Sequence, residues 1–244
     1  MHGSTPRSSP DGFPSTRRSV VVGLCGSDAG ARREALEEFA NDYRPSLHGY
    51  LRRRHRHTPD AIDDLLQSFF LHLQERDLLA RFDPSRGRFR GYLRVLLDRW
   101  MIDAHRSRQR LRRGGGAVHE AIDDHDALLA VEDADPDRVF REEWVRQLFR
   151  LALDDLERDA RNSGRALQWE VFDRYDVRPE TEGTRPTYTE LAESLGIPTT
   201  KVTNDLHAAR RRFRQMLLAR LRDVCRDEVE WREEARELLG IDVP

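Results

Sequence analysis

Apolar side chains recur every three or four positions along most of the chain from residue 32 onward, which is the spacing of an amphipathic helix. The first such stretch, residues 35–51, contains Pro45, which predicts two helices that are kinked or broken there. A broad apolar stripe then predicts a helix over residues 60–76, and a long helix is predicted from Phe89 to about Arg110. Asp-Pro and Arg-Gly pairs in residues 82–91 predict a loop between these two helices.

A second group of helical patterns begins at about Val139. It predicts one helix with apolar residues between 144 and 156, a second with apolar residues between 167 and 175, and a Pro- and Gly-marked loop over residues 177–186. A last helix is predicted over residues 228–239, where Gly240 ends it. These patterns predict an all-α protein with two small helical domains.

Residues 187–214 predict a helix-turn-helix. Thr187 and Glu190 have the spacing of a capping box, which begins a helix. Gly196 supplies a left-handed stop and Pro198 prevents simple continuation, so a turn follows. Either Thr199 or Thr200 is expected to cap the second helix.

The second helix of this motif has two faces. Val202, Leu206, Ala209 and Phe213 recur along one stripe, which predicts the buried side of the helix. The opposite side and its flank carry polar and basic side chains, at Thr200, Thr203, Asn204, His207, Arg210, Arg211 and Arg214. Such side chains can hydrogen-bond base edges or phosphates in a DNA major groove. An ordinary helical hairpin with a solvated polar face is the alternative interpretation.

The chain of 244 residues has a net charge of only −2, but its charges are segregated. Residues 117–137 contain many Asp and Glu and neither Arg nor Lys, and three glycines precede them, which predicts a flexible acidic linker. Residues 1–30 are rich in Ser, Pro and Gly and are expected to be disordered. The predicted division is a tail (1–30), a first helical domain (31–113), the linker (114–138), a second helical domain (139–225) and a C-terminal helical extension (226–244).

Several observations argue against a membrane protein, a metalloprotein or an enzyme. No segment approaches the length of a membrane span, and the two cysteines, Cys25 and Cys225, have no metal-ligand spacing, which favours a reducing cytoplasm. His55 and His57 have no carboxylate or Cys beside them at a ligand spacing, so a solvated basic face is preferred to a metal site. Residue patterns typical of nucleophilic, phosphate-binding or two-metal catalysis are missing. We therefore expect a cytoplasmic protein that is not an enzyme and requires no metal or cofactor.

Three segments, in this order, resemble the sigma-70 superfamily of bacterial RNA polymerase sigma factors, and in particular its small two-domain extracytoplasmic-function (ECF) group. Residues 64–71, DLLQSFFL, are similar to the family's region 2.2 signature D-L-x-Q-x-x-F-L. Residues 82–106 are similar to the F-D-P, G-x-F-R and I-D-x-x-R pattern of regions 2.3 and 2.4, and residues 191–210 are similar to region 4.2. The resemblance covers residues 32–113, a sigma region 2-like bundle, and residues 140–224, a region 4-like helix-turn-helix domain.

The resemblance implies a partner for each segment. In the family, region 2.2 docks on the β′ subunit of core polymerase, which assigns core binding here to Asp63, Asp64, Gln67 and Phe70. Regions 2.3 and 2.4 capture the −10 promoter element as a single strand, which assigns that contact to Arg88, Phe89, Arg90, Tyr92, Arg99 and Arg106. Region 4.2 reads the −35 element as duplex DNA, which assigns it to Thr200, Lys201, Thr203, Asn204, His207, Arg210, Arg211 and Arg214. The aromatic residues of the −10 set can equally belong to the hydrophobic core.

Two positions depart from the family's pattern. Asp98-Arg99 stands where many members have Arg-Asn, so the −10 base preference is expected to differ. Asp205 stands where a basic residue is common, and a carboxylate there repels phosphate but can accept a hydrogen bond from cytosine N4. The helix predicted over residues 228–239 resembles extensions found in some ECF-like branches, which could regulate the factor in cis.

We therefore expect a sigma factor that binds core RNA polymerase through its β′ and β subunits and directs initiation at promoters with −10 and −35 elements. The expected partners are core polymerase and promoter DNA, together with a possible anti-sigma factor, and no membrane. Two alternatives stay open. One is a stand-alone helix-turn-helix regulator, and the other is a decoy module that binds core polymerase or an anti-sigma factor.

Overall fold

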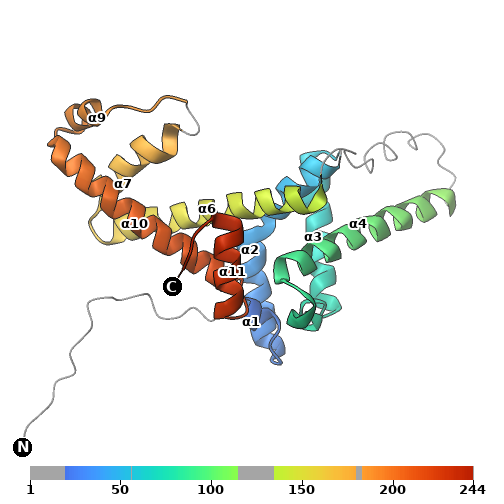
Figure 1. Ribbon diagram of the computed structural model, residues 1–244. Coiled ribbons are helices and arrows are strands. Elements are labelled where there is room, and N and C mark those ends of the chain that lie inside the picture. The colour runs from blue at the N-terminus through green and yellow to red at the C-terminus, as the bar shows by residue number, and fades with distance from the viewer. Residues whose placement is uncertain (1–19, 56, 115–134, 180–182, 244) are drawn as a thin grey trace, which may run out of the picture.

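The computed structural model describes residues 20–55, 57–114, 135–179 and 183–243, and within these ranges every regular element is helical (Figure 1). The first half of the chain forms α1 (Val20–Leu24), α2 (Ala29–Arg54), α3 (Pro59–Glu75) and α4 (Phe89–Gly114), with 3-10 turns at Leu79–Arg81 and Pro84–Arg86. The second half forms α6 (Pro136–Asn162), α7 (Ala166–Phe172) with a π-helical turn at Asp173–Val177, α9 (Tyr188–Leu195), α10 (Thr199–Asp223) and α11 (Glu228–Leu239). The predicted all-α fold class is confirmed. None of these helices is both long and apolar enough to cross a membrane.

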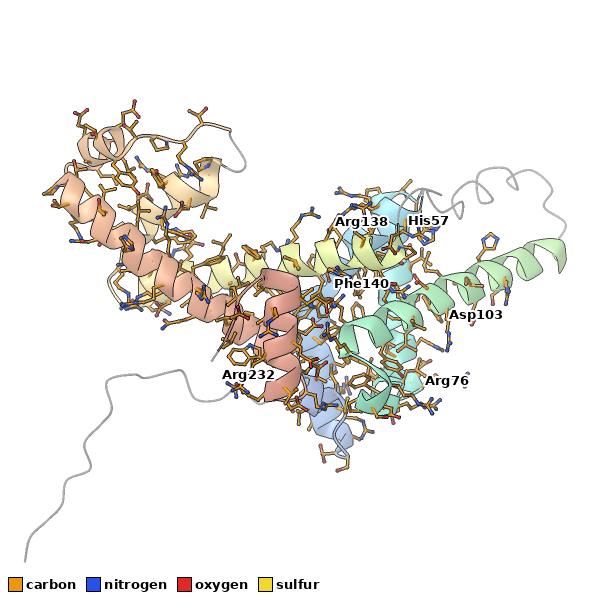
Figure 2. All side chains as sticks on the ribbon, in the orientation of Figure 1. His57, Arg76, Asp103, Arg138, Phe140 and Arg232 are labelled. Carbon is orange, nitrogen blue, oxygen red and sulfur yellow. The ribbon has the colours of Figure 1, made fainter. Side chains whose placement is uncertain are left out.

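Two hydrophobic cores divide the described residues into two lobes, and α6 and α10 belong to both. The first lobe contains α1 to α4, the N-terminal part of α6, the C-terminal part of α10, and α11. The second lobe contains α7, α9 and the remaining parts of α6 and α10. Figure 1, and Figure 2 with the side chains drawn, show α6 and α10 running from one lobe to the other. The helix-turn-helix is therefore held at one end of two long shared helices.

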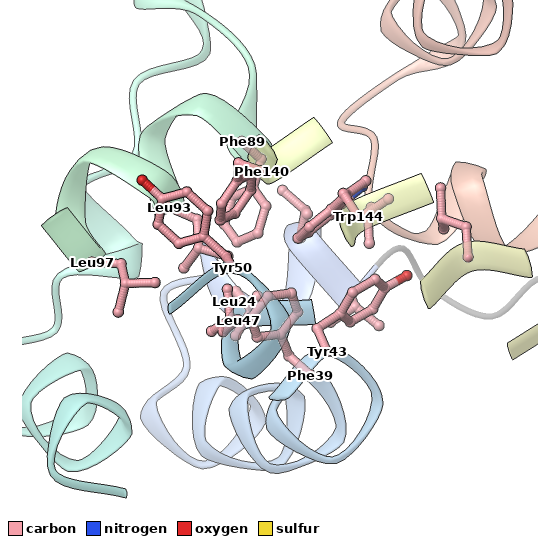
Figure 3. Close-up of a cluster of buried hydrophobic side chains, with 14 of the residues drawn as sticks. Leu24, Phe39, Tyr43, Leu47, Tyr50, Phe89, Leu93, Leu97, Phe140 and Trp144 are labelled. Carbon is pink, nitrogen blue, oxygen red and sulfur yellow. The ribbon is translucent and has the colours of Figure 1, made fainter. Parts of the chain in front are cut away.

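Aromatic rings fill the centre of the first core (Figure 3). The side chains of Phe39, Tyr43 and Trp144 are each 2% exposed or less. The rings of Tyr43 and Trp144 stack with centroids 4.8 Å apart, and Phe39 meets Phe89 edge-on at 5.6 Å. Because Phe39 and Tyr43 lie on α2 and Trp144 on α6, this cluster fixes α6 against α2.

The packing of α6 and α10 differs from the predicted division of the chain. Residues Val139, Phe140 and Leu148, placed in the second domain by sequence, are buried in the first core. The same holds for Leu217 and Leu221 near the end of α10. Periodicity identifies the apolar face of a helix but not the neighbour that covers it. The sequence could therefore not show that α6 and α10 contribute to the core of the first lobe. Residues 115–134 of the predicted linker lie outside the described residues.

Pro45 does not divide α2, which continues as one helix from Ala29 to Arg54, so the prediction of two helices is wrong. Proline has no N–H, and the carbonyl of Asn41 therefore loses its usual helical partner. Phe39 and Leu47, which flank this turn, are fully buried in the first core. We attribute the unbroken helix to the burial of one apolar face on both sides of the proline, which offsets the lost hydrogen bond.

Helical structure also begins earlier in the chain than predicted, at Val20. Val20, Val21 and Leu24 of α1 are between 2% and 7% exposed and belong to the first core. Asp28 then caps α2 by accepting a hydrogen bond from the backbone N–H of Ala31 at 2.6 Å. The predicted disordered tail is therefore wrong for residues 20–30, and residues 1–19 lie outside the described residues. An apolar run this short carries too weak a periodic signal to be identified as a helix.

Candidate functional site

The turn of the helix-turn-helix has the predicted local geometry. The backbone N–H of Thr187 donates to Glu190 Oε2 at 2.7 Å, and the N–H of Glu190 donates to Thr187 Oγ1 at 3.2 Å, which completes the capping box. Gly196 ends α9 in the left-handed region, with φ 65° and ψ 34°. A residue with a Cβ is strained there, which accounts for the glycine. Leu191 and Ala192 bury the apolar face of α9 in the second core.

The N-terminus of α10 differs from the prediction. Pro198 is the N-cap and α10 begins at Thr199, so neither Thr199 nor Thr200 caps the helix with its side chain. The extended backbone of Pro198, with ψ 145°, leads directly into the first turn and places both threonines inside the helix. The hydroxyl of Thr203 donates back to the carbonyl of Thr199 at 3.2 Å, which orients that side chain along the helix.

One face of α10 is open to solvent along about four turns. Val202, Leu206 and Ala209 are 1% exposed or less and pack in the second core. The opposite stripe is exposed at intervals of four and three residues, at Thr200, Asn204, His207, Arg211 and Arg214. These five predicted contacts therefore share one surface, and their side chains are of the kinds that can hydrogen-bond base edges or phosphates.

Two other predicted contacts on α10 make ion pairs within the chain. Arg210 donates to both carboxylate oxygens of Asp176, at 2.7 and 2.9 Å, and this hydrogen-bonded carboxylate raises the pKa of its guanidinium. Lys201 pairs with Asp205 at 2.9 Å. Asp205 is only 9% exposed, so it does not lie on the open face where a cytosine contact was considered. These two hydrogen bonds to Asp176 hold Arg210, which is therefore less free than the sequence suggested.

The outward side of α3 carries most of the predicted polymerase contacts. Asp63, Asp64 and Gln67 are exposed, while Leu65 and Phe69 are buried beneath them. The predicted contact Phe70 is only partly exposed and packs against the first core. Leu71, which the sequence analysis did not include among these contacts, is 54% exposed on α3. Its place outside the main apolar stripe of residues 62–73 is the signal that could have identified it.

Asp63 is not an isolated carboxylate. The guanidinium of Arg44 on α2 donates to the Asp63 side chain at 3.1 Å and to its backbone carbonyl at 3.0 Å. The Asp63 side chain still keeps 53% of its surface exposed. It can therefore accept hydrogen bonds from a basic partner on its open side.

The aromatic residues predicted to stack on bases lie mainly inside the protein. Phe89 is 1% exposed, and its ring meets those of Phe39 and Phe82 edge-on at 5.6 and 5.5 Å. Tyr92 is half-buried, and its hydroxyl donates to the carbonyl of Leu78 at 2.6 Å. The prediction that Phe89 meets DNA is contradicted by this burial, since the start of α4 folds its ring into the first core.

The predicted −10 arginines fall into two groups. Arg99 and Arg106 are exposed on α4. Arg88 and Arg90, at the start of α4, are in ion pairs with glutamates of α11, which lies some 145 residues further along the chain. The sequence placed these arginines on an open loop, and the contact with α11 was not foreseen.

Asp98, one of the positions that depart from the family's pattern, has an internal role. It accepts hydrogen bonds from the Tyr50 hydroxyl at 2.7 Å and from Arg94 at 2.8 Å. Burial and the neighbouring Asp98 carboxylate raise the pKa of Tyr50, which therefore stays protonated as a donor. Arg94 also pairs with Asp137 at 2.8 Å, so this group joins α2, α4 and the start of α6. Asp98 is thus bound to side chains of α2 and of its own helix.

Within the described residues, no group of three or more His, Cys, Asp or Glu side chains has the arrangement of a metal site. His55 is half-buried near His57, and burial lowers its pKa to about 4. Burial raises the pKa of both the Cys25 and Cys225 thiols, which makes them poor nucleophiles at neutral pH. The two cysteines are therefore part of the packing of the first lobe.

The comparison with known families concerns the first lobe. Residues 39–111 match the family model of sigma-70 region 2, a segment that covers most of α2, all of α3 and nearly all of α4. No curated protein matches the chain significantly. The matched segment includes the exposed side of α3 and all the arginines of the predicted −10 set.

Proposed function

Because the chain carries a sigma-70 region 2 domain, and so belongs to the sigma-70 superfamily with a sigma factor's role in transcription initiation, we propose that it is a dissociable promoter-specificity subunit of the ECF type. Its first lobe binds core RNA polymerase in the cytoplasm, and its second lobe binds duplex promoter DNA. The polymerase supplies the catalytic machinery. The match to region 2 over residues 39–111 is the observation that carries the proposal.

The exposed side of α3 is the proposed polymerase contact. Asp63, Asp64 and Gln67 offer hydrogen-bond acceptors to a basic partner, and the exposed Leu71 adds an apolar contact beside them. Apolar groups surrounded by polar ones are the usual composition of a protein interface. The buried Leu65 and Phe69 hold α3 firmly in the first core, so this surface is presented by a rigid helix.

The triple variant D63A/D64A/Q67A is expected to bind core RNA polymerase at least about tenfold more weakly than the unaltered chain. The reason is that several central contacts are lost together. The measurement is co-elution of the purified chain with core polymerase on size exclusion, followed by a titration to obtain Kd. A matched control is E34A/E37A, which removes two exposed acidic side chains from α2.

The two possible failures of this experiment differ. If the unaltered chain does not bind core polymerase, the proposed function is wrong and a stand-alone DNA-binding regulator becomes the better interpretation. If the chain binds and the α3 variant binds equally well, the function stands but its polymerase contact lies elsewhere. Loss of binding in both the α3 variant and E34A/E37A would indicate a general charge effect.

The open stripe of α10 is the proposed contact with the −35 element. Its five exposed side chains combine base-reading groups, such as Asn204 and Arg211, with the basic Arg214 at the C-terminal end of the stripe. Arg and Asn make bidentate contacts with guanine and adenine, while arginines at the edge of a groove bind phosphates. The second lobe therefore offers both parts of a duplex-reading surface.

Arg211→Ala is expected to cost about 1–3 kcal/mol of discrimination at a single base pair if Arg211 reads a base edge. Arg210→Ala should change discrimination far less, because Arg210 is held by Asp176. Preferred duplexes are first selected from a randomised library, and Kd is then measured for each single base-pair change. A uniform loss of affinity over all duplexes in Arg211→Ala would instead assign Arg211 to a phosphate.

A further inference from the structure

The acidic helix α11 lies on the two arginines at the start of α4. Arg88 pairs with Glu234 at 2.7 Å, with Glu233 at 3.4 Å, and with Glu237. Arg90 pairs with Glu234 at 3.3 Å and with Glu237 at 3.2 Å. Three carboxylates of one helix are therefore gathered around two guanidinium groups.

This contact excludes most of the solvent around its centre. The side chains of Glu234 and Arg90 are 5% and 12% exposed, and Arg88 is 30% exposed. The apolar side of α11 is anchored beside it, since Ala235 is fully buried and Trp231 donates its indole N–H to the carbonyl of Leu218 at 2.9 Å. Both arginines are thus unavailable to a large ligand while α11 is in place.

The chemistry of the contact is that of a phosphate backbone. An arginine fork binds carboxylates and phosphates with the same geometry, so acidic side chains spaced along a helix can occupy places that successive phosphates would take. The contact has an exposed margin, because Glu233 and Glu237 keep 59% and 36% of their side-chain surface. A polyanion can therefore approach the contact from that margin.

We propose that α11 is a tethered competitor of nucleic acid: it occupies the surface of Arg88 and Arg90, and a single-stranded nucleic acid binds there only when α11 is displaced. The proposal rests on the proposed function only in taking these two arginines as contacts for nucleic-acid phosphates. The occupant that α11 excludes is a flexible single strand, because the two arginines lie within the segment matched to region 2 and not on the open stripe of α10 that suits duplex DNA.

The test measures the affinity of the full chain for a fluorescent single-stranded DNA of mixed sequence, by anisotropy at low salt and without polymerase. The variant E233Q/E234Q/E237Q keeps the shape of α11 but removes the three charges. It is expected to bind about five- to tenfold more tightly than the unaltered chain, because freed arginines dominate the affinity for phosphates. E228Q is the matched control, since Glu228 lies on α11 but pairs with Arg222 and Arg232.

A second measurement separates displacement from a general charge effect. R88A/R90A in the triple-glutamine background should return the affinity to that of the unaltered chain.

Hydrogen exchange provides a third measurement. Saturating single-stranded DNA should accelerate exchange of the α11 amides in the unaltered chain, which a purely structural helix would not show. The proposal is overturned if the triple variant gains no affinity, if the gain survives R88A/R90A, or if bound DNA leaves α11 exchange unchanged. None of these measurements uses polymerase. The core-binding titration therefore tests the proposed function independently of the competition between α11 and single-stranded DNA.

Discussion

Trp144→Ala is expected to lower the free energy of unfolding by about 3–5 kcal/mol, the usual cost of removing a large buried aromatic side chain. Trp144 is 1% exposed, and its ring contacts those of Tyr43, Phe140 and Phe39 with centroids 4.8, 5.8 and 6.4 Å away. Its removal leaves a cavity where α6 rests on α2. Urea denaturation followed by circular dichroism measures the change.

Two further variants identify the cause of this effect. The indole N–H of Trp144 has no hydrogen-bond partner in the described part of the chain, so Trp144→Phe, which keeps a ring, should lose much less stability than Trp144→Ala. Phe149→Ala, on the same helix but 40% exposed, should cost about 1 kcal/mol. A loss in Trp144→Phe equal to that in Trp144→Ala would contradict the importance of ring packing.

Arg220→Met is expected to destabilise the chain by about 2–4 kcal/mol, because it removes the buried cation that joins Asp42 to Asp155 and leaves only the exposed Arg158 beside Asp155. The Arg220 side chain is 8% exposed and donates to Asp155 at 2.5 and 2.9 Å and to Asp42 at 2.7 Å. The estimate lies somewhat below the cost for a fully buried pair, since Asp42 and Asp155 are 25% and 22% exposed. The same urea titration provides the measurement.

Arg158→Met is the matched control for this ion pair. Arg158 also binds Asp155, at 2.9 Å, but its side chain is 62% exposed. A surface pair of this kind contributes about 1 kcal/mol or less. Equal losses in Arg158→Met and Arg220→Met would show that the link between α2, α6 and α10 through Arg220 has no special contribution.

Local features of the fold were predictable from the sequence because their causes lie within a few residues. The capping box of Thr187 and Glu190, the left-handed stops at Gly196 and Gly240, and the helical periods all depend on near neighbours in the chain. The open stripe of α10 was also predictable, since a period of 3.6 places the positions opposite a buried stripe at the surface. The apolar pattern of residues 202–213 therefore defined the exposed face before any tertiary contact was known.

Contacts between distant segments were not predictable in the same way. Arginine is a residue type that commonly binds DNA, which is why Arg210 and Arg90 were predicted as DNA contacts. In the structure they bind carboxylates instead, Asp176 and Glu234, which lie 34 and 144 residues away in the sequence. The sequence also left open whether Phe89 is a stacking residue or a core residue, because both roles use the same side chain. Only the packing of neighbouring elements distinguishes these possibilities.

The sharing of α6 and α10 between the two lobes has a consequence for folding cooperativity. A partly folded chain with one lobe intact would require both helices to end in mid-course, which exposes backbone groups at two new helix ends and removes apolar neighbours from the remaining core. Both lobes therefore gain from the formation of the same two helices, and the free energy of opening either lobe includes part of the stability of the other. The elements that can open at low cost are those that belong to a single lobe and sit at its edge, such as α9 and α11.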